Sequence, residues 1–481
     1  MFDILINSCY IKTDIIILFI FKYFNVVRGG IMDRSLYMKI YDSFVSDIKS
    51  GQLPPHTKLP SKRELCALKG VSQSTVETAY GILQAEGYIY SLPKKGYFAG
   101  DLISLSPPVK TAAPIKKAQS AEPQLFCRLS TNGADISVFP FSSWAKMTKD
   151  TVYNNPHLLS RGEPQGDLEL RQQLQAFLHK HRGVVCSPEQ IIVGAGMDYL
   201  LDIILRLLPK DTVFGLENPG YQATYGVIEA NGRKTLPIKL DESGMSAASL
   251  AESGADVAYI TPSHQFPLCI TMPIARRLQL LKWASEKDGR YIIEDDYDSE
   301  FRYAFRPIPA MQGMDEHGKV IYIGTFSRGL APSIRVAYMV LPPSLLSEYE
   351  KASKHMSSTV SRFEQHTLCR FIADGLYSRH LRRAGNLYRQ KQALLREKLN
   401  GISDLTIRGD EAGLHFLVSS NRMSERDMVA SALAEGIGIS GLSRYWRGDG
   451  CPNGVCLIGF AGPDIATLEE AARRLKKVWS R

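Results

Sequence analysis

The stretch from Asp101 to Gln124 divides the chain and so limits what it can fold into. It is rich in Pro, Ala, Ser and Lys and shows no apolar periodicity, which is typical of a linker. A chain of 481 residues also exceeds the size at which a single hydrophobic core usually stops growing. We therefore expect a small domain over residues 32–100, a linker over 101–125 and a large domain over 126–481.

Residues 1–31 are considered separately because they contain an apolar run from Ile15 to Phe21. The run is too short to cross a membrane, which takes about 20 mostly apolar residues. Gly29-Gly30-Ile31 before Met32 is what translation through a purine-rich ribosome-binding site would give. We therefore expect Met32 to be the native start, residues 1–31 to be disordered or not native, and no membrane association.

Charge and cysteine content exclude few classes of protein. The net charge of +9 is spread over a long chain and argues only weakly for an anionic partner. The eight cysteines form no CxxC pair and lack zinc-ligand spacing. This usage predicts a reducing, cytoplasmic location and no metal site.

The small domain carries the pattern of a helix-turn-helix. Apolar residues recur at helical spacing at Ile40, Phe44, Val45 and Ile48, and Gly51 follows as a helix stop. Ser61 and Glu64 have the spacing of a capping box for a second helix. A turn beginning at Gly70 then leads into a third helix beginning at Gln73. Two short helices around a glycine-containing turn predict a helix-turn-helix.

We expect the start of the third helix and a following hairpin to contact DNA. Small polar side chains there can bond phosphates and base edges, with two cations beside them. Tyr88–Tyr90 and Tyr97–Phe98 flank a basic turn, which predicts a hairpin whose tip can lie against the DNA backbone. On the pattern alone, a plain helical domain with solvated lysines is the alternative. The candidate DNA-contacting residues are Lys62, Arg63, Ser72, Gln73, Ser74, Thr75, Lys94, Lys95 and Gly96.

Four motifs in this order resemble the GntR-type winged-helix family. They are Leu36-Tyr37-x-x-Ile40-Tyr41, Leu59-Pro60-Ser61-x-Arg63-Glu64-Leu65, Val71-Ser72-x-x-Thr75-Val76 and Glu86-Gly87-Tyr88. The resemblance implies a winged helix-turn-helix domain that binds double-stranded DNA. Gln73 departs from the family, whose members commonly carry a DNA-contacting arginine there, so we expect a different base preference.

From about Phe126 onward, buried-looking strands such as 190–193 and 291–293 alternate with helical patterns, which predicts an α/β domain with a mostly parallel sheet. Four segments resemble fold-type I aminotransferases, in the MocR-type regulatory branch that joins this fold to a GntR-type head. They are Gly162-Glu163-Pro164-Gln165-Gly166, Glu217-Asn218-Pro219-Gly220-Tyr221, Thr261-Pro262-Ser263-His264-Gln265-Phe266-Pro267 and Ile293-Glu294-Asp295-Asp296-Tyr297-Asp298-Ser299-Glu300-Phe301. The fifth hallmark, Gly324-Thr325-Phe326-Ser327-Arg328, breaks the match at its last residue.

This resemblance implies a pocket for pyridoxal 5′-phosphate (PLP). Asp295 would pair with the ring nitrogen, Tyr297 would bond the ring hydroxyl oxygen, and Tyr221 would stack on the ring. Side chains and helix-start amides would bind the phosphate, namely Thr325, Arg335, Ala195, Gly196 and Met197. The helix start lacks the hydroxyls common in relatives, so we expect a weaker grip on the phosphate.

Arg328 occupies the position at which relatives carry the lysine that forms a Schiff base with the cofactor. A guanidinium stays protonated, so it can supply neither that link nor a neutral base. We therefore expect no catalytic residue, no ordinary transamination, and PLP, where present, held non-covalently. Three interpretations of Arg328 remain open: it holds an anionic ligand or the cofactor phosphate, it pairs with Asp295, or a single base change in a lysine codon produced it as a sequence error or decayed allele.

The leading hypothesis is a DNA-binding transcriptional regulator whose body, a homodimer by resemblance, senses a small molecule and repositions two heads. GABA-sensing relatives place an arginine after Gly-Phe-Ala, where this chain has Gly462, so a GABA-like effector is less expected. The rival hypothesis is an active aminotransferase with a DNA-binding extension, which needs a substitute lysine. Lys282 and Lys287 in a helical pattern, and Lys319 before a strand, are not obvious substitutes. In a third hypothesis, the body is only a dimer scaffold.

Overall fold

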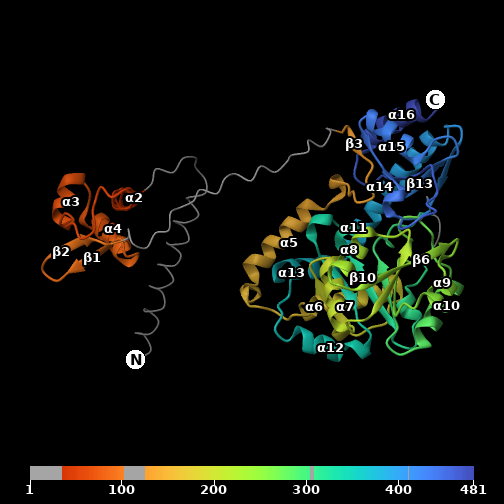
Figure 1. The fold of residues 1–481 in the computed structure, drawn as a ribbon, viewed down its shortest axis with the longest axis horizontal. Helices are drawn as coiled ribbons and strands as arrows, with labels where there is room; N and C mark the ends of the chain where they lie inside the picture. Colours follow the sequence, from red (N-terminus) through yellow and green to blue (C-terminus); the bar gives the residue numbers. More distant parts are fainter. Residues whose placement is uncertain (1–34, 102–124, 304–307, 410, 481) are drawn as a thin grey trace. The chain divides into compact units, whose positions relative to one another are not determined.

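A computed structural model of the chain describes residues 35–101, 125–303, 308–409 and 411–480. They form two compact units, divided between Ala121 and Glu122 (Figure 1). The expected non-native start and nearly all of the expected linker lie outside the described residues. Within the described part of the chain, no helix is long and apolar enough to cross a membrane.

The N-terminal unit contains helices and a two-stranded hairpin, which are α2 (Leu36–Lys49), α3 (Lys62–Lys69), α4 (Gln73–Ala85), β1 (Ile89–Leu92) and β2 (Gly96–Ala99). The Ser61 amide donates to Glu64 Oε2 at 2.8 Å and the Glu64 amide donates to Ser61 Oγ at 3.3 Å, which forms the capping box. Gly70 ends α3 in a left-handed conformation at φ 64°, and the Ser72 side chain caps α4. The structure therefore has the predicted helix-turn-helix.

A small apolar core holds this head together. It consists of Ile40, Ile48, Leu59, Leu65, Val76, Ala79, Tyr80, Leu83, Ile89 and Ala99. The Tyr80 hydroxyl donates to the Pro60 carbonyl at 2.8 Å and so fixes α4 against the loop before α3. Lys58 bridges to Phe98, which ties the same loop to the hairpin. The turn between β1 and β2 is built from Pro93, Lys94 and Lys95, and forms the tip of the predicted wing.

The C-terminal unit is built on an eight-stranded sheet in the order β4-β11-β10-β9-β8-β5-β6-β7. Its strands are β4 (Ile191–Gly194), β5 (Val213–Asn218), β6 (Lys234–Asp241), β7 (Gly244–Met245), β8 (Val257–Ile260), β9 (Tyr291–Asp296), β10 (Val320–Thr325) and β11 (Ala337–Val340). Strand β9 is parallel to β8 and β10, and β5 is parallel to β8 and β6, whereas β11 is antiparallel to both neighbours. The prediction of a mostly parallel sheet in an α/β fold is confirmed.

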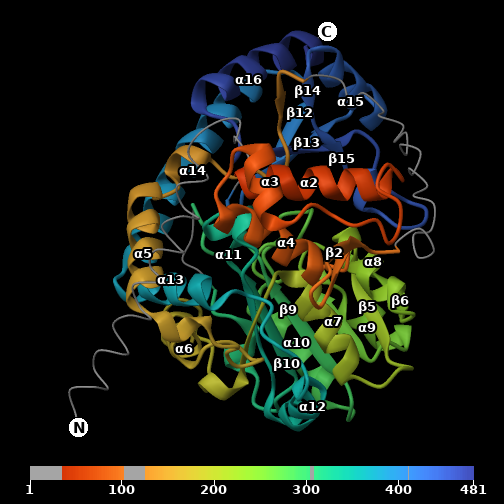
Figure 2. The same ribbon diagram turned by 90° about the vertical axis from the view of Figure 1, so that its left-hand side faces the viewer.

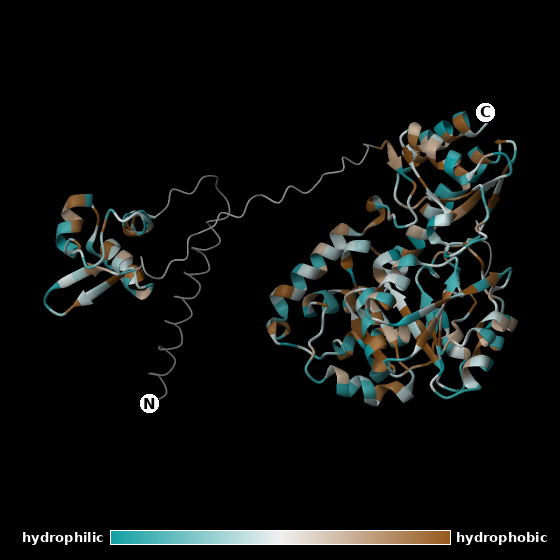
Figure 3. Cartoon of the chain, viewed as in Figure 1, coloured by the Kyte–Doolittle hydropathy of each residue, from teal (hydrophilic) through white to brown (hydrophobic). Residues whose placement is uncertain are grey.

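Helices cover both faces of this sheet. They are α5 (Phe141–Asn154), α6 (Leu168–Arg182), α7 (Met197–Leu207), α8 (Gln222–Ala230), α9 (Ala247–Ser253), α10 (Ile274–Ser285), α12 (Pro343–Ser353) and α13 (Arg362–Ala373), with one-turn helices η2 (Ile136–Val138), η3 (Pro156–Leu159), η4 (Pro188–Gln190) and η5 (Met311–Met314). Ile292 packs with the α9 and α10 cluster and Ile293 with the α7 and α8 cluster, because successive strand residues face opposite sides. Figures 1 and 2 show α5, α6 and α13 side by side, and Figure 3 shows apolar residues along the inner strands.

A smaller sheet follows in the order β12-β13-β16-β15. Its elements and their neighbours are α14 (Leu376–Leu399), β12 (Leu405–Arg408), β13 (His415–Ser420), α15 (Glu425–Ala434), β14 (Ile437–Gly438), β15 (Ser440–Gly441), η7 (Leu442–Tyr445), β16 (Val455–Gly459) and α16 (Ile465–Trp479), and β14 pairs with β3 (Cys127–Arg128). Lys391 of α14 is fully buried and donates to Asp135 Oδ2 at 2.5 Å, to the Ala461 carbonyl at 2.9 Å and to the Pro463 carbonyl. This lysine therefore fixes the segment around Asp135 to the chain after β16.

The connection between β10 and β11 is short and carries α11 (Phe326–Gly329) and η6 (Pro332–Ile334). A parallel partner would need a crossover of a dozen or more residues, so this connection makes β11 antiparallel to β10. It lies at the edge where the parallel strands β5, β8 and β9 also end. In open α/β sheets this carboxyl edge is where ligands bind.

Candidate functional site

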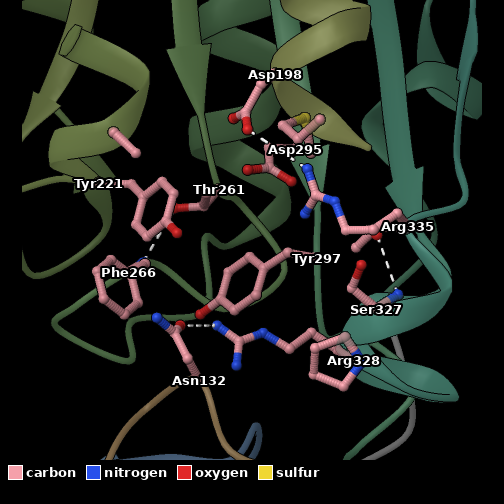
Figure 4. A pocket seen from close by; sticks show the side chains of 14 residues that line it. Asn132, Asp198, Tyr221, Thr261, Phe266, Asp295, Tyr297, Ser327, Arg328 and Arg335 are labelled. Carbon is pink, nitrogen blue, oxygen red and sulfur yellow. Dashed lines mark hydrogen bonds and ion pairs between the residues drawn. The ribbon is translucent and has the colours of Figure 1, made fainter. Parts of the chain in front are cut away.

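A cavity of about 330 Å³ lies at this edge of the sheet (Figure 4). Its lining residues are Asn132, Met197, Asp198, Tyr221, Ala223, Thr261, Phe266, Asp295, Tyr297, Thr325, Ser327, Arg328, Pro332 and Arg335. The structure thus brings together every side chain expected from the resemblance to bind PLP. Of the three residues whose backbone amides were expected to bind the phosphate, Met197 lines the cavity, whereas Ala195 and Gly196 immediately precede α7, and Gly196 lies against Arg335.

Asp295 is the second-last residue of β9 and is the buried acid that lines the cavity. Its Oδ2 accepts from the Tyr259 hydroxyl at 2.5 Å, whereas its Oδ1 has no partner among the described residues. Burial, with a smaller contribution from the charges of Asp296 and Asp298, raises the pKa of Asp295 to about 7, although the hydrogen bond from Tyr259 lowers it. A buried carboxylate oxygen without a donor fits the protonated ring nitrogen of PLP.

Aromatic side chains form the middle of the cavity. Tyr221 meets Phe266 edge to face, with ring centroids 5.4 Å apart. The Tyr297 hydroxyl lies 3.1 Å from His264 Nδ1, which in turn lies 2.8 Å from Asp298 Oδ2. Although burial lowers the pKa of His264, the charges of Asp298 and Cys269 and the hydrogen bonds to both together outweigh it and raise that pKa to about 10. Tyr297 therefore lies beside a buried imidazolium–carboxylate pair.

His264 and Asp298 were not predicted from the sequence as partners of Tyr297. His264 lies in the loop after β8 and Asp298 follows β9, and both belong to segments that resemble the family. Their spacing in the sequence does not show that these two segments come into contact. The only available signal was the presence of a histidine within a motif that resembles the family.

At the other end of the cavity, Arg335 adopts a left-handed conformation at φ 52° and its Nη2 lies 3.5 Å from Asp198 Oδ2. Thr325 Oγ1 accepts from the Ser327 amide at 3.1 Å, and Ser327 Oγ has no described partner. Thr325, Ser327 and Arg335 can therefore supply donors to a phosphate. Asp198, which the sequence analysis did not consider, competes with that phosphate for Arg335.

The backbone at the start of α7 differs from the expectation. The Ala195 amide donates to Thr359 Oγ1 at 3.0 Å and the Gly196 amide donates to the Gly194 carbonyl at 2.8 Å, so neither is free for a phosphate. Gly196 has another role. A Cβ added there, at φ 96°, would lie 2.4 Å from Arg335 Nη2, so the glycine makes room for that guanidinium.

Arg328 extends from α11 toward the segment that follows β3 (Figure 4). Its Nη1 donates to the Thr131 carbonyl and its Nη2 donates to Asn132 Oδ1 at 2.6 Å. The interpretation in which Arg328 pairs with Asp295 and fills the vacated site is therefore wrong, because the guanidinium is bound to Thr131 and Asn132 instead. Its charge acts on Asp295 only as a minor influence that lowers the pKa.

No lysine is among the residues that line this cavity in the described part of the chain. Lys282 lies in α10 and Lys319 directly precedes β10, as expected. Lys287 lies two residues beyond the end of α10 at Ser285, so its expected position in a helix is wrong. Lys391 is buried in the ion pair with Asp135.

In the head, Lys62 lies at the start of α3 and Gln73 at the start of α4, and both contact one acid. Lys62 Nζ lies 3.3 Å from Glu77 Oε1, and Gln73 Nε2 donates to the same oxygen at 3.2 Å. Lys62 also lies over the Tyr97 ring, which links α3 to the wing. Glu77 was missed because the sequence analysis considered only donors at the helix start.

The other candidate DNA contacts take up the expected local structure. Ser72 Oγ lies 3.0 Å from Ser74 Oγ and 2.8 Å from Thr75 Oγ1, which forms a hydroxyl cluster at the start of α4. Arg63, Lys94, Lys95 and Gly96 are exposed. Gly96 begins β2 at φ 101°, and Lys94 lies in the turn at φ 62°. Contact of these residues with DNA remains a prediction.

Comparisons with known proteins agree with this arrangement. Residues 128–475 match the family "Aminotransferase class I and II", and residues 36–98 match "Bacterial regulatory proteins, gntR family". The chain is 37% identical to the uncharacterized HTH-type transcriptional regulator YdeL of Bacillus subtilis, over 93% of this chain and 97% of that protein. It is 32% identical to the probable rhizopine catabolism regulatory protein MocR of Rhizobium meliloti, over 93% and 94%.

A further relative is the HTH-type pyridoxine biosynthesis transcriptional regulator PdxR of Corynebacterium glutamicum, which is 30% identical over 88% of this chain and 91% of that protein. Among solved structures, an archaeal alanine:glyoxylate aminotransferase superposes with a TM-score of 0.68 at 22% identity, over 75% of this chain and 91% of that one. That structure supports the fold alone.

The head and body therefore define a helix-turn-helix protein with a fold-type I aminotransferase-like domain. The chain belongs to the MocR-type transcriptional regulators, in which a gntR-family head is joined to an aminotransferase class I and II domain. The predicted fold class, family and regulatory function are confirmed. GntR-type heads bind DNA, and the aminotransferase-like family is PLP-dependent.

Proposed function

We propose that this regulator acts as a homodimer on its operator, and that the cavity in its body binds a small-molecule effector, with PLP held there non-covalently. The observation that carries the proposal is the state of the cavity: its cofactor-binding side chains converge, but a guanidinium stands where the covalent anchor would be. A pocket that binds without reacting suits a sensor better than an enzyme.

The residues present fit the ring of PLP well. Asp295 Oδ1 needs a donor, Tyr221 and Tyr297 offer ring faces and a hydroxyl, and Thr261 lines the wall between them. When bound, PLP supplies an electron-accepting ring and an aldehyde. Arg335, Thr325 and Ser327 would hold the phosphate, against competition from Asp198.

The rival function, an active aminotransferase, needs a neutral amine at the aldehyde. Arg328 cannot supply one, and no lysine is found among the described lining residues. A dimer scaffold without ligand binding is the third alternative. The unpartnered Asp295 Oδ1 and Ser327 Oγ argue against it, since a cavity without a ligand leaves both buried polar atoms unsatisfied.

Exposed apolar side chains near the start of the body support the proposed homodimer. Ile136, Phe141, Tyr153 and Leu159 are each at least 60% exposed. Exposed apolar side chains of this size mark candidate interaction surfaces. If they form it, Tyr153→Glu should produce monomers in light scattering, whereas Lys398→Glu, in α14, should leave the dimer intact.

Cofactor binding is tested by adding PLP to the purified protein, removing excess by dialysis, treating with borohydride and analysing peptides by mass spectrometry. We expect PLP-dependent absorption before dialysis and no lysine-linked adduct. An adduct on any lysine would contradict the proposal.

DNA binding is tested with promoter fragments across a salt series. Affinity should fall steeply with salt because phosphate contacts release counterions. Arg63→Ala should weaken binding several-fold, whereas Lys49→Ala, at the end of α2, should not. Salt-independent binding, or equal affinities for wild type and Arg63→Ala, would refute the placement of α3 on DNA.

A further inference from the structure

We propose that Arg328 and Asn132 form a binding site for the carboxylate group of the effector. The inference rests on the proposed function, since it assumes that the cavity takes up a small molecule, and it adds the chemical class of that molecule. It is carried by the hydrogen bonds, charge and fixed position of Arg328.

The hydrogen bonds leave Arg328 with donors to spare. Its guanidinium donates to the Thr131 carbonyl and to Asn132 Oδ1, both neutral acceptors, and the remaining N–H groups have no acceptor among the described residues. Because Asn132 Oδ1 accepts from Arg328, the side-chain nitrogen Nδ2 of Asn132 is left as a further donor. Both residues line the cavity.

The charge of Arg328 also lacks a counterion. The other lining arginine, Arg335, lies 3.5 Å from the carboxylate of Asp198. By contrast, no described carboxylate lies within salt-bridge distance of Arg328, whose bonded partners are uncharged. A cation on the wall of a cavity that has no counterion favours an anion as its ligand.

Both sides of this site are held in place before any ligand arrives. On one side, Ser130 Oγ accepts from the Asn132 amide at 3.2 Å, and Asp135 is fixed by Lys391 and by the Tyr388 hydroxyl. On the other side, His380 Nε2 lies 2.8 Å from the carbonyl oxygen of Gly329 in α11. A preorganised site loses less entropy on binding.

The geometry favours a carboxylate over a neutral polar group. Parallel N–H donors of a guanidinium match the two oxygens of a carboxylate, and a neutral group would leave the charge of Arg328 unmatched. Phosphate has its own candidate donors in the same cavity, in Arg335, Thr325 and Ser327. We therefore assign the Arg328 end to a carboxylate.

The test uses full-length protein loaded with PLP, and measures binding of succinate, of its neutral analogue succinamide and of inorganic phosphate by calorimetry. We expect succinate to bind wild type, succinamide not to bind, and Arg328→Gln to weaken succinate by about tenfold or more, as for a lost charge-assisted hydrogen bond. Asn132→Ala should weaken it by a smaller factor. Arg161→Gln is the matched control, because Arg161 also donates to neutral oxygens, of Ser357 and Met356, but does not line the cavity.

The outcomes separate this inference from the proposed function. If Arg328→Gln binds PLP as wild type does, and binds succinate with unchanged affinity, the inference is wrong while the proposed function stands. If phosphate rather than succinate depends on Arg328, the assignment to a carboxylate is wrong. If wild type binds neither PLP nor succinate, the inference and the proposed function both fail.

Discussion

Replacing Arg328 by lysine should convert a non-covalent PLP pocket into a covalent one. The structure places residue 328 in the short α11 segment at the carboxyl edge of the sheet, on the same cavity as Asp295. A lysine there restores a primary amine whose neutral form can attack the PLP aldehyde, which a guanidinium cannot do. The other cofactor-binding side chains need not change.

The cost of Arg328→Lys can be worked out from the contacts that it removes. A lysine ammonium lacks the two separate Nη donors by which the guanidinium reaches the Thr131 carbonyl and Asn132 Oδ1. At least one of these hydrogen bonds is therefore lost. A hydrogen bond to a charged group contributes about 1.5–3 kcal/mol, and partial exposure of Arg328 favours the lower end. A loss of about 1.5 kcal/mol lowers the melting temperature of a domain of this size by only a few degrees.

The assay is borohydride reduction followed by peptide mass analysis, with retention of PLP after dialysis as a second measurement. We expect about one PLP per subunit on the peptide that carries residue 328, and none in wild type or in Arg328→Gln. Circular dichroism confirms that each variant is folded. A folded Arg328→Lys protein that forms no adduct would refute the conclusion that only the amine is missing from this pocket.

Three further predictions concern single residues. Glu77→Gln frees Lys62 and Gln73 and removes a negative charge from α4, so DNA affinity should rise by about tenfold, with a salt slope steeper by about one, whereas Glu86→Gln in the same head should have no such effect. Equal slopes for wild type and Glu77→Gln would count against this. Gly196→Ala should weaken PLP binding in spectral titration because its Cβ displaces the Arg335 guanidinium, whereas Gly226→Ala, with open space around its Cβ, should bind normally. Unchanged binding in Gly196→Ala would mean that Arg335 does not hold the phosphate. In the folded state the pKa of Asp295 is raised to about 7 from 3.8, so between these pH values the folded state keeps a proton that the unfolded state loses, and stability falls as pH rises. Asp295→Asn should remove this loss, so it should raise the melting temperature of PLP-free protein more at pH 8 than at pH 4. The same variant should weaken PLP binding. Identical pH profiles for the two proteins would show that Asp295 does not titrate as its burial implies.

The local structure of the head followed from its sequence because short-range chemistry determines it. Ser61 and Glu64 lie within one helical turn, so their spacing alone specifies the capping box that the structure contains. Gly70 likewise adopts the left-handed conformation that glycine favours at a helix end. Glu77 could not be assigned in the same way, because its contact with Lys62 depends on how α3 and α4 pack.

In the body, the motifs identified the wall of the cavity, but not what each group is bonded to. Asp295 lies near the end of β9 and Tyr297 directly follows that strand, which places both at the carboxyl edge of the sheet, whereas their binding of PLP remains a prediction. The contact of Arg328 with Thr131 and Asn132 joins positions almost 200 residues apart, and no periodicity or spacing encodes such a contact. The occupied amide of Ala195 depends on Thr359, which is 164 residues away along the chain.

The retained acid at position 295 argues that the pocket is used. Burial raises the pKa of Asp295 to about 7, and its Oδ1 has no described partner, so in the absence of a ligand this residue destabilises the fold at neutral pH. An apolar residue of similar size would remove that cost if the body served only to join two subunits. The same reasoning applies to Arg328, whose charge is matched by no described carboxylate. Asp295 and Arg328 thus face the same cavity, and neither has a counterion among the described residues. A cationic ring nitrogen bound to Asp295 and a carboxylate bound to Arg328 would explain both groups together. The two ligand groups can belong to one molecule, or to PLP and an effector bound side by side.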